Sequence, residues 1–429
     1  MLSFYNIFTK GGFLLKIGKF AAKHNVSIDT VRHYMNLGLI FPEKMGGWYE
    51  FGDNSDEAIN AILRYKEMGF SLDEIHELLN FQRLSRLTIR TDLEFFKSKF
   101  LLKSDNLEKE KEHIEHKIQV ISKLLEKINH LESVTLLSHP TGVPIDFLPQ
   151  LECPFCNKPL QLAKASIENN MIINGDLNCD CGTHWKILHG VLTEKQLISN
   201  LNDVSPDEVL ERNIHLKTRY YKSTSSKFLD FIFQGIEWQR QRLTELLTPN
   251  SIILEPGIGI GVALSNFYDH LPDDIKYIGV DNNFERILFT KTLFEKEYNP
   301  TRLIYICCSF NNIPIKSNSI DFVVDYTGSF NYNSKNEIWL TETLKNLLKE
   351  NAYWLGSFLF YSKNSDLLNY PEQVSKVLDL NNIQSDFKDH NINIDLQKII
   401  GPVDESGENE IFKNGLDLYQ WLMLGKNNK

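Results

Sequence analysis

The sequence predicts a multidomain protein: a helical amino-terminal domain and a coiled-coil helix, then a small cysteine-bearing β module and an α/β doubly wound domain. Three observations predict this layout. Apolar runs alternate with helix-like segments after residue 252, and glycines follow the first run at every second position. Apolar residues recur every seven positions over 107–128, and two close cysteine pairs lie between these regions. A length of 429 residues allows about three domains.

The amino-terminal segment 16–42 is typical of two short helices joined by a turn, with Ser27 as the N-cap of the second. On that second helix, Thr30, Arg32, His33 and Tyr34 are candidates for contact with a major groove. Arginine pairs bidentately with guanine, and hydroxyl groups reach phosphates. A Gly-Gly turn then leads to two aromatic candidates, Trp48 and Tyr49, and a third helix is expected to end near residue 79.

Local charge favours a nucleic-acid partner for this region. The whole chain has 46 basic and 56 acidic residues, a net charge of −10, whereas residues 10–45 carry a basic excess. The charged residues of that stretch are Lys10, Lys16, Lys19, Lys23, Asp29, Arg32, Glu43 and Lys44. A basic island on an acidic protein is typical of a phosphate-binding surface.

With these residues, segment 14–80 resembles the winged helix-turn-helix of the MerR family. The resemblance implies an all-α winged helix-turn-helix DNA-binding domain over 1–89 that recognises a promoter palindrome in double-stranded DNA. In the wing, Glu50 follows Tyr49 where the family usually has an arginine.

Residues 90–135 are expected to form a coiled-coil dimerisation helix. Phe100, Leu107, Ile114, Ile121 and Ile128 repeat every seven residues. Ile118 and Leu125 fill the second position of the same seam. The pattern favours a homodimer, as the MerR resemblance also implies, and the alternative is packing of this face within one chain.

Two cysteine pairs predict a structural zinc site in a zinc-ribbon-like module over 149–192. Cys153 and Cys156 form the first pair, and Cys179 and Cys181 form the second. Four thiolates in two close pairs match the tetrahedral preference of zinc. The second pair has one intervening residue where the ribbons of some ribosomal-RNA methyltransferases have two, so His184 or His189 could replace one sulfur. Reduced, metal-free cysteines are the alternative.

A nucleoside-type cofactor site is predicted around residues 252–281. The apolar run 252–254 ends at Glu255, and Gly257, Gly259 and Gly261 follow. Asp281 ends the next apolar run, 20 residues past Gly261. Glycines let the backbone approach a ligand closely, and an acid at the second strand tip suits a ribose diol.

This arrangement resembles the class I S-adenosylmethionine-dependent methyltransferases, over about 240–425 of a domain expected at 208–429. The resemblance implies S-adenosyl-L-methionine as cofactor. Its expected ligands are Glu255, Gly257, Gly259, Gly261, Asp281, Asn282, Ser309, Phe310 and Asp325. These enzymes commonly place an acid beside the adenine amino group, where this chain has Ser309. No catalytic residue is identified, although Asp325 and Tyr326 follow the fourth strand.

Further elements are expected from the same patterns. Residues 208–248 should be helical and cover the cleft, and 336–350 should form another helix. Strands are expected at 304–307, 320–325, 352–360 and 416–425.

The sequence thus predicts a MerR-type transcriptional regulator fused to a methyltransferase. The alternatives are a methyltransferase acting on structured RNA or a small molecule, with the first domain as a binding module, and a non-catalytic S-adenosylmethionine sensor. No apolar run approaches the ~18–20 residues of a membrane span, so a cytoplasmic protein is expected.

Overall fold

The computed structural model describes residues 14–85, 90–133, 140–197, 205–298, 300–408 and 410–428. The chain forms two compact units, residues 1–134 and 135–429. The sequence-based division into 1–89, 90–135, 149–192 and 208–429 is finer than these units and stays a prediction about independent folding.

The first unit begins with the helix pair expected from the sequence. α1 (Ile17–Lys23) and α2 (Ile28–Asn36) are joined by a turn, and the Ser27 hydroxyl accepts a hydrogen bond from Thr30 N at 3.0 Å. A small antiparallel sheet, in the order β1-β3-β2, means that the domain is not all-α as predicted. Its strands are β1 (Leu15–Lys16), β2 (Glu43–Met45) and β3 (Trp48–Phe51).

The predicted third helix is two helices. α3 (Asp53–Glu67) ends before Gly69, which has a φ of +80° that favours glycine, and α4 (Leu72–Ser85) begins after Ser71. Ser71 and Glu74 cap each other: Ser71 N donates to Glu74 Oε2 at 2.7 Å, and Glu74 N donates to Ser71 Oγ at 3.2 Å. Sequence periodicity continued across this break because both helices bury apolar residues against one core.

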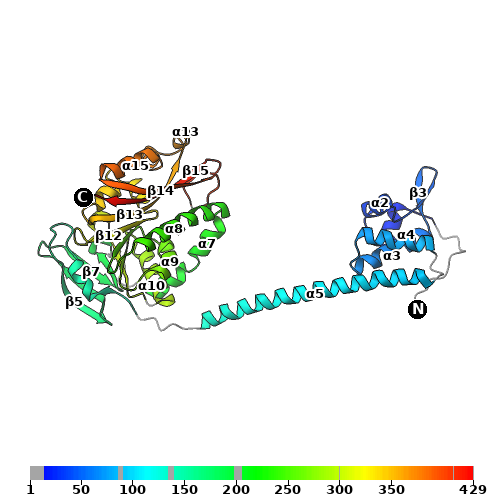
Figure 1. Cartoon of the computed structure of the whole chain (residues 1–429), viewed down its shortest axis with the longest axis horizontal. Helices are drawn as coiled ribbons and strands as arrows, with labels where there is room; N and C mark the ends of the chain where they lie inside the picture. The colour runs from blue at the N-terminus through cyan, green and yellow to red at the C-terminus, as the bar shows by residue number, and fades with distance from the viewer. Residues whose placement is uncertain are drawn as a thin grey trace. The chain divides into compact units, whose positions relative to one another are not determined.

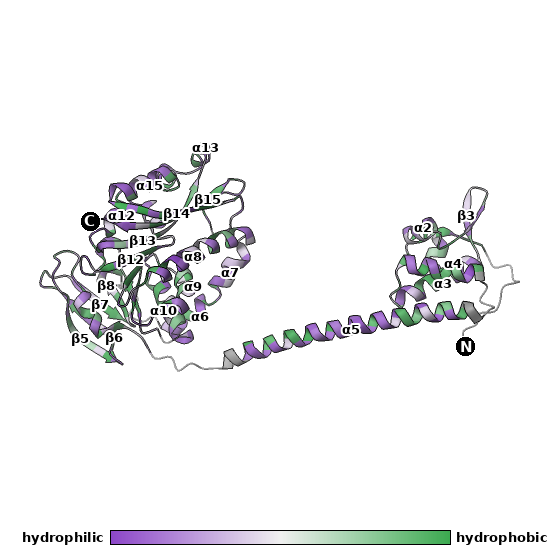
Figure 2. Cartoon of the chain, viewed as in Figure 1, coloured by the Kyte–Doolittle hydropathy of each residue, from purple (hydrophilic) through white to green (hydrophobic). Residues whose placement is uncertain are grey.

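The long helix α5 (Arg90–Ser133) has two different parts. Near its start, Phe95, Phe96 and Phe100 pack on the core of the first unit, and Lys103 pairs with Glu74 at 3.3 Å. Farther along, the apolar seam residues are between 46% and 57% exposed. These are Leu107, Ile114, Ile118, Ile121, Leu125 and Ile128. Figure 2 shows apolar residues recurring between hydrophilic ones along this helix.

The second unit is built on one 12-stranded sheet in the order β14-β15-β13-β12-β9-β10-β11-β8-β7-β6-β4, with β5 paired to β6 (Figure 1). The parallel centre consists of β9 (Ile252–Pro256), β10 (Lys276–Asp281), β11 (Leu303–Cys307), β12 (Ile320–Asp325) and β13 (Leu348–Tyr361). Strand order reverses between β9 and β12, which is where ligands bind in such sheets.

The cysteine-bearing strands continue this sheet. They are β4 (Val143–Pro144), β5 (Gln161–Glu168), β6 (Met171–Asn178), β7 (His184–Leu188) and β8 (Val191–Glu194). β8 pairs in parallel with β11, with Thr193 opposite Cys307. One short 3₁₀ helix, Ile145–Gln150, lies between β4 and β5, and another, Lys195–Leu197, follows β8.

At the other edge, β15 (Leu418–Asn427) is antiparallel to both β13 and β14 (Ile392–Val403). The sequence analysis expected β15 but not β14. Most residues of β14 are solvent-exposed, so it lacks the apolar run that marked the other strands.

Helices cover the faces of the sheet. The region before β9 contains α6 (Pro206–Asn213), α7 (Leu216–Ser223) and α8 (Ser226–Leu246). Between strands lie α9 (Val262–Phe267), α10 (Phe284–Glu297), α11 (Gly328–Asn333) and α12 (Leu340–Leu344), with 3₁₀ turns at Tyr268–His270 and Phe310–Asn312. α13 (Asn364–Leu367), α14 (Glu372–Val377) and α15 (Leu380–Asp389) follow β13. Of the expected helix at 336–350 only α12 is helical, because residues 336–339 form no helix and β13 begins at Leu348.

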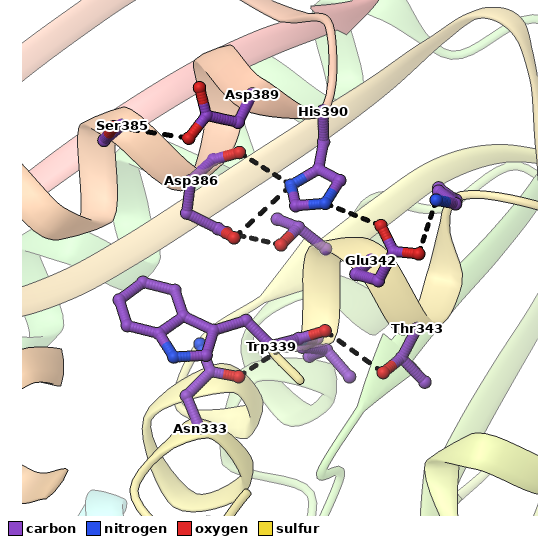
Figure 3. Close-up of polar contacts among 11 residues, drawn as sticks. Asn333, Trp339, Glu342, Thr343, Ser385, Asp386, Asp389 and His390 are labelled. Carbon is purple, nitrogen blue, oxygen red and sulfur yellow. Dashed lines mark hydrogen bonds and ion pairs between the residues drawn. The ribbon is translucent and has the colours of Figure 1, made fainter. Parts of the chain in front are cut away.

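A polar cluster joins α12 to the end of α15 (Figure 3). His390 Nε2 lies 2.7 Å from Glu342 Oε2, and His390 Nδ1 lies 2.8 Å from the Asp386 carbonyl oxygen. Thr341 donates a hydrogen bond to the Asp386 carboxylate. Burial raises the pKa of Asp386.

Among the described residues, no helix is both long enough and apolar enough to span a membrane.

Candidate functional site

The glycine loop lies at the point where strand order reverses. Gly257 and Gly259 have φ values of +79° and +51°, which glycine adopts without strain. Gly257 N and Ile258 N both donate to the Val280 carbonyl oxygen, at 2.7 and 3.1 Å. A Cβ on Gly259 would meet only the Gly257 carbonyl oxygen, at 3.8 Å. The loop is therefore fixed to β10 while its Gly259 side stays open.

Two acids lie beside this loop. Asp281 Oδ2 accepts from Gly259 N at 3.0 Å, and its Oδ1 accepts from Asn283 N at 2.9 Å. Glu255 is buried and accepts a hydrogen bond from Tyr277 Oη at 2.6 Å. Burial raises the pKa of Glu255 to about 8, and the nearby Asp281 charge adds to the shift.

A cleft of about 840 Å³ opens over the loop. This volume falls within the range of small-molecule sites. Seven of the nine predicted cofactor ligands line it: Glu255, Gly257, Gly259, Asp281, Asn282, Ser309 and Phe310.

The other two predicted ligands, Gly261 and Asp325, lie outside the cleft lining. Gly261 is the N-cap of α9 with a φ of +72°, and a Cβ there would lie 2.6 Å from Thr290 Cγ2. Asp325 is fully buried, and its Oδ1 accepts from Ser329 N at 3.0 Å. Burial raises the pKa of Asp325 to about 6. Both residues thus contact the elements that support the loops, and their predicted role as cofactor ligands stays a prediction.

The opposite wall of the cleft contains residues that the sequence analysis did not assign as ligands. α7 contributes Arg219 and Tyr220, and Tyr220 Oη donates to Glu410 Oε1 at 2.6 Å. The segment after β12 contributes Tyr326, Thr327, Gly328, Asn331, Tyr332, Lys335 and Asn336. Of these residues the sequence analysis noted only Tyr326, because Arg219 and Tyr220 meet the segment after β12 only in the folded chain.

Three cations line the cleft without a carboxylate partner among the described residues: Arg219, Arg286 and Lys335. The two acids, Glu255 and Asp281, lie at the ends of β9 and β10. Both acids of the cleft thus lie beside the glycine loop, and the same lining also contains the three cations.

The four cysteines of the two pairs form one cluster. Their Sγ atoms all lie within 4.8 Å of one another. Cys153 Sγ is 3.6 Å from Cys181 Sγ, and Cys156 Sγ is 3.2 Å from Cys179 Sγ. Tight turns position both pairs, with Asn157 N donating to the Cys153 carbonyl oxygen and Gly182 N to that of Cys179, each at 2.9 Å.

Neither histidine belongs to this cluster among the described residues. His184 Nδ1 lies 2.7 Å from Asn178 Oδ1. The single residue between Cys179 and Cys181 therefore does not prevent all four sulfurs from converging.

On the first unit, most of the predicted DNA-contact residues are on the surface. Ser27, Arg32 and His33 are exposed and Thr30 is partly exposed, and Arg32 Nη1 lies 3.1 Å from Asp29 Oδ1. In the wing, Trp48 is 68% exposed, with Lys16 Nζ 5.5 Å from its ring centre, and Lys44 Nζ lies 5.8 Å from that of Tyr49. Tyr34 is the exception: it is only 2% exposed and belongs to the core with Val31, so the prediction that it contacts DNA is corrected.

Comparison with known proteins agrees with the amino-terminal geometry. Residues 15–82 match the family described as MerR HTH family regulatory protein. The chain is 32% identical over 114 residues to the HTH-type transcriptional activator mta of Bacillus subtilis, covering 25% of this chain and 39% of that protein. It is 28% identical over 162 residues to heavy metal-dependent transcription regulator 2 of Rhizobium meliloti, covering 37% of this chain and 94% of that protein.

Solved structures resemble the second unit at low identity. The crystal structure of the MccD protein matches with a TM-score of 0.37 and 12% sequence identity. The match covers 46% of this chain and 98% of the MccD chain. A SAM dependent methyltransferase from Aquifex aeolicus has a TM-score of 0.33 at 13% identity, covering 52% of this chain and 99% of its own. Residues 15–82 thus match the MerR family of helix-turn-helix proteins, and the second unit that follows is built on a mixed sheet.

Proposed function

We propose that the protein is a MerR-type DNA-binding transcriptional regulator whose second unit binds S-adenosylmethionine and transfers its methyl group. The observation that carries the proposal is the cleft over the glycine loop, with Glu255 and Asp281 beside Gly259 and an aromatic wall at Phe310. When bound, S-adenosylmethionine supplies a methyl group on a positively charged sulfur.

The chain's own residues bind and orient. Each Asp281 oxygen accepts one backbone N–H and retains a lone pair for a ribose hydroxyl. The open side of Gly259 allows close approach of the ligand to the backbone. The acceptor would lie between this ligand and the wall formed by α7 and residues 326–336. Methyl transfer from a sulfonium depends mainly on alignment, so no general base is required of the cleft.

Calorimetry with S-adenosylmethionine and S-adenosylhomocysteine tests the cofactor proposal. We expect both to bind the wild type. Asp281→Ala should weaken binding by roughly ten- to a hundredfold, the loss of charge-assisted hydrogen bonds worth ~1.5–3 kcal/mol. Asp274→Ala, which removes an exposed carboxylate just before β10, is the matched control and should bind normally. A wild type that binds neither compound would refute the proposal.

For the first unit, we infer that the DNA site is a two-fold symmetric promoter sequence. Arg32 would reach the edge of a base, and Trp48 and Tyr49 of the wing would lie beside the sugar-phosphate backbone of the DNA. Footprinting of the upstream region, with and without S-adenosylmethionine, tests the site and its coupling to the cofactor. Arg32→Ala should cost ~1–3 kcal/mol at the specific site, whereas Arg64→Ala on α3 should not. Protection of structured RNA in place of duplex DNA would favour the RNA-directed alternative. A promoter partner would place the protein in the cytoplasm.

We propose that α5 mediates a homodimer, because its apolar seam is exposed from Leu107 to Ile128. Two copies would present two α2 helices to the halves of a palindrome.

We also propose a structural zinc ion held by Cys153, Cys156, Cys179 and Cys181. Tetrahedral zinc thiolate sites need sulfurs about 3.8 Å apart, and the four Sγ atoms lie within 4.8 Å of one another. Elemental analysis should give about one zinc per chain. Cys179→Ser should lower that ratio, and His184→Ala should leave it unchanged. Full zinc occupancy in Cys179→Ser would show that the ligand set is wrong.

A further inference from the structure

A carboxylate from the cysteine-bearing part of the sheet lies against the wall of the cleft. Glu194 ends β8, which runs parallel to β11 with Thr193 opposite Cys307. The loop that follows β11 therefore begins beside Glu194. Asn312 Nδ2 donates to Glu194 Oε1 at 2.8 Å, and Ser309 N lies 3.4 Å from Glu194 Oε2.

The end of β11 thus lies between two carboxylates that come from different strands. Asp281 ends β10 on one side, and Glu194 ends β8 on the other. Burial raises the pKa of the Cys307 thiol to about 12, and the negative charges of Asp281 and Glu194 each contribute to this rise. Of this group, Asp281 and Ser309 line the cleft.

A nucleoside seated on Asp281 by its ribose would extend its base toward Ser309 and Phe310. Phe310 offers a ring face for stacking. An exocyclic amino group of the base donates hydrogen bonds, and Ser309 offers only a neutral hydroxyl. The Glu194 carboxylate has acceptor capacity to spare: Asn312 occupies one lone pair, and the Ser309 contact is long for an N–H···O bond.

We propose that Glu194 is the acceptor for the amino group of the adenine base, so that the cysteine-bearing strands form part of the cofactor site. This inference rests on the proposed S-adenosylmethionine site. It also accounts for Ser309, since the acid that similar enzymes place there is supplied by a residue 115 positions earlier in the chain.

The sheet is built to hold β8 at this place. Glu295 of α10 accepts hydrogen bonds from Thr141 N and Thr141 Oγ1, and from the buried Lys291 Nζ. Gly190, in the turn before β8, packs so closely that a Cβ would lie 2.1 Å from the Thr141 carbonyl oxygen. These contacts fix the turn that leads into β8 against α10, and Glu194 is only four residues beyond it.

The test compares S-adenosylhomocysteine with S-inosylhomocysteine, in which a carbonyl replaces the amino group. We expect the wild type to prefer the adenosyl compound by at least about tenfold, because a carboxylate attracts the amino group and repels the carbonyl. In Glu194→Gln that preference should fall to within about threefold, since an amide can both donate and accept. Glu168→Gln, an exposed residue at the end of β5, should keep the wild-type preference.

A second variant provides rescue. Ser309→Asp added to Glu194→Gln should restore the adenosyl preference, because it returns an acid to the same wall. Metal content and thermal unfolding of each variant establish that it is folded. Equal weakening of both ligands in Glu194→Gln, with the preference intact, would overturn the proposal and leave Glu194 as a residue that only orders the loop. A wild type that binds neither compound refutes the methyltransferase proposal itself, which is a different outcome.

Discussion

Glu255 is a carboxyl group that burial keeps largely neutral near pH 7. Its pKa is raised from 4.5 to about 8, mainly because burial disfavours the charged form. A folded-state pKa above the unfolded value means that the group's contribution to stability is complete below pH 4.5 and is lost as the pH rises through about 8. Burial also raises the pKa of Asp325, to about 6, so the contribution of Asp325 to stability is lost at a lower pH than that of Glu255.

We therefore expect the free energy of unfolding of the ligand-free protein to fall as the pH rises from about 4.5 to about 8. Glu255→Gln should reduce that fall, because a neutral amide does not titrate. Urea unfolding at a series of pH values measures the slope. Glu297→Gln, an exposed residue of α10, serves as control and should reproduce the wild-type slope. An unchanged slope in Glu255→Gln would show that this carboxyl group is already ionised in the folded protein.

The glycine loop offers a matched pair of substitutions. Gly259 and Gly261 both have positive φ, but only at Gly261 would a new Cβ clash, lying 2.6 Å from Thr290 Cγ2. A non-glycine residue held in the left-handed region costs on the order of 1–3 kcal/mol. We expect Gly261→Ala to lower the thermal unfolding temperature more than Gly259→Ala. Gly259→Ala should instead weaken binding of S-adenosylhomocysteine, because its side chain would face the cleft. Equal loss of stability in the two variants would contradict this assignment.

At this scale the sequence indicated the loop and its acids but not the whole site. Glycines at alternate positions and an acid at a strand tip are local patterns, so Gly257, Gly259 and Asp281 were predictable. Arg219 and Lys335 are brought together only by tertiary packing. Tyr34 was misassigned because polar neighbours obscured its i, i+3 spacing from Val31, which places both residues in the core.

Among the elements, α5 has the most direct test. Ile121 belongs to the exposed seam, whereas Val120, which is also exposed, lies outside it. Ile121→Asp should raise the dissociation constant of the proposed dimer by about a hundredfold or more, because it would bury a charge between helices. Val120→Asp should leave it nearly unchanged. Sedimentation equilibrium of both variants and the wild type provides the comparison, and a wild type that is monomeric throughout would exclude the dimer.

Elements with strong periodicity were predictable, and those defined by their neighbours were not. The buried parallel strands appear as apolar runs, and the heptads of α5 are unmistakable. β14 was missed because its exposed residues alternate poorly and its pairing with β15 lies far from any local signal. The sequence predicted one helix where the structure has α3 and α4. The break comes at Gly69, whose positive φ is not evident from the hydrophobic pattern.

For the whole molecule, the feature that the sequence did not predict is the parallel pairing of β8 with β11. Residues 149–192 and 208–429 were predicted from the sequence as separate domains, but their strands pair in one sheet. Parallel pairing between segments more than a hundred residues apart leaves no trace in either segment. The cysteine cluster and the cleft over the glycine loop consequently belong to one compact unit, residues 135–429.

That join has a consequence for solubility. Every residue of β11, from Leu303 to Cys307, is buried, and β8 covers the edge that β11 would otherwise present. A fragment beginning at residue 205 would expose a row of unpaired amide and carbonyl groups on an apolar strand, which is a template for edge-to-edge aggregation. We expect this fragment to scatter light at micromolar concentration, whereas a fragment beginning at residue 140 should remain clear. The cysteine-bearing strands therefore act as a physical cap that keeps neighbouring copies of the sheet from adding to one another.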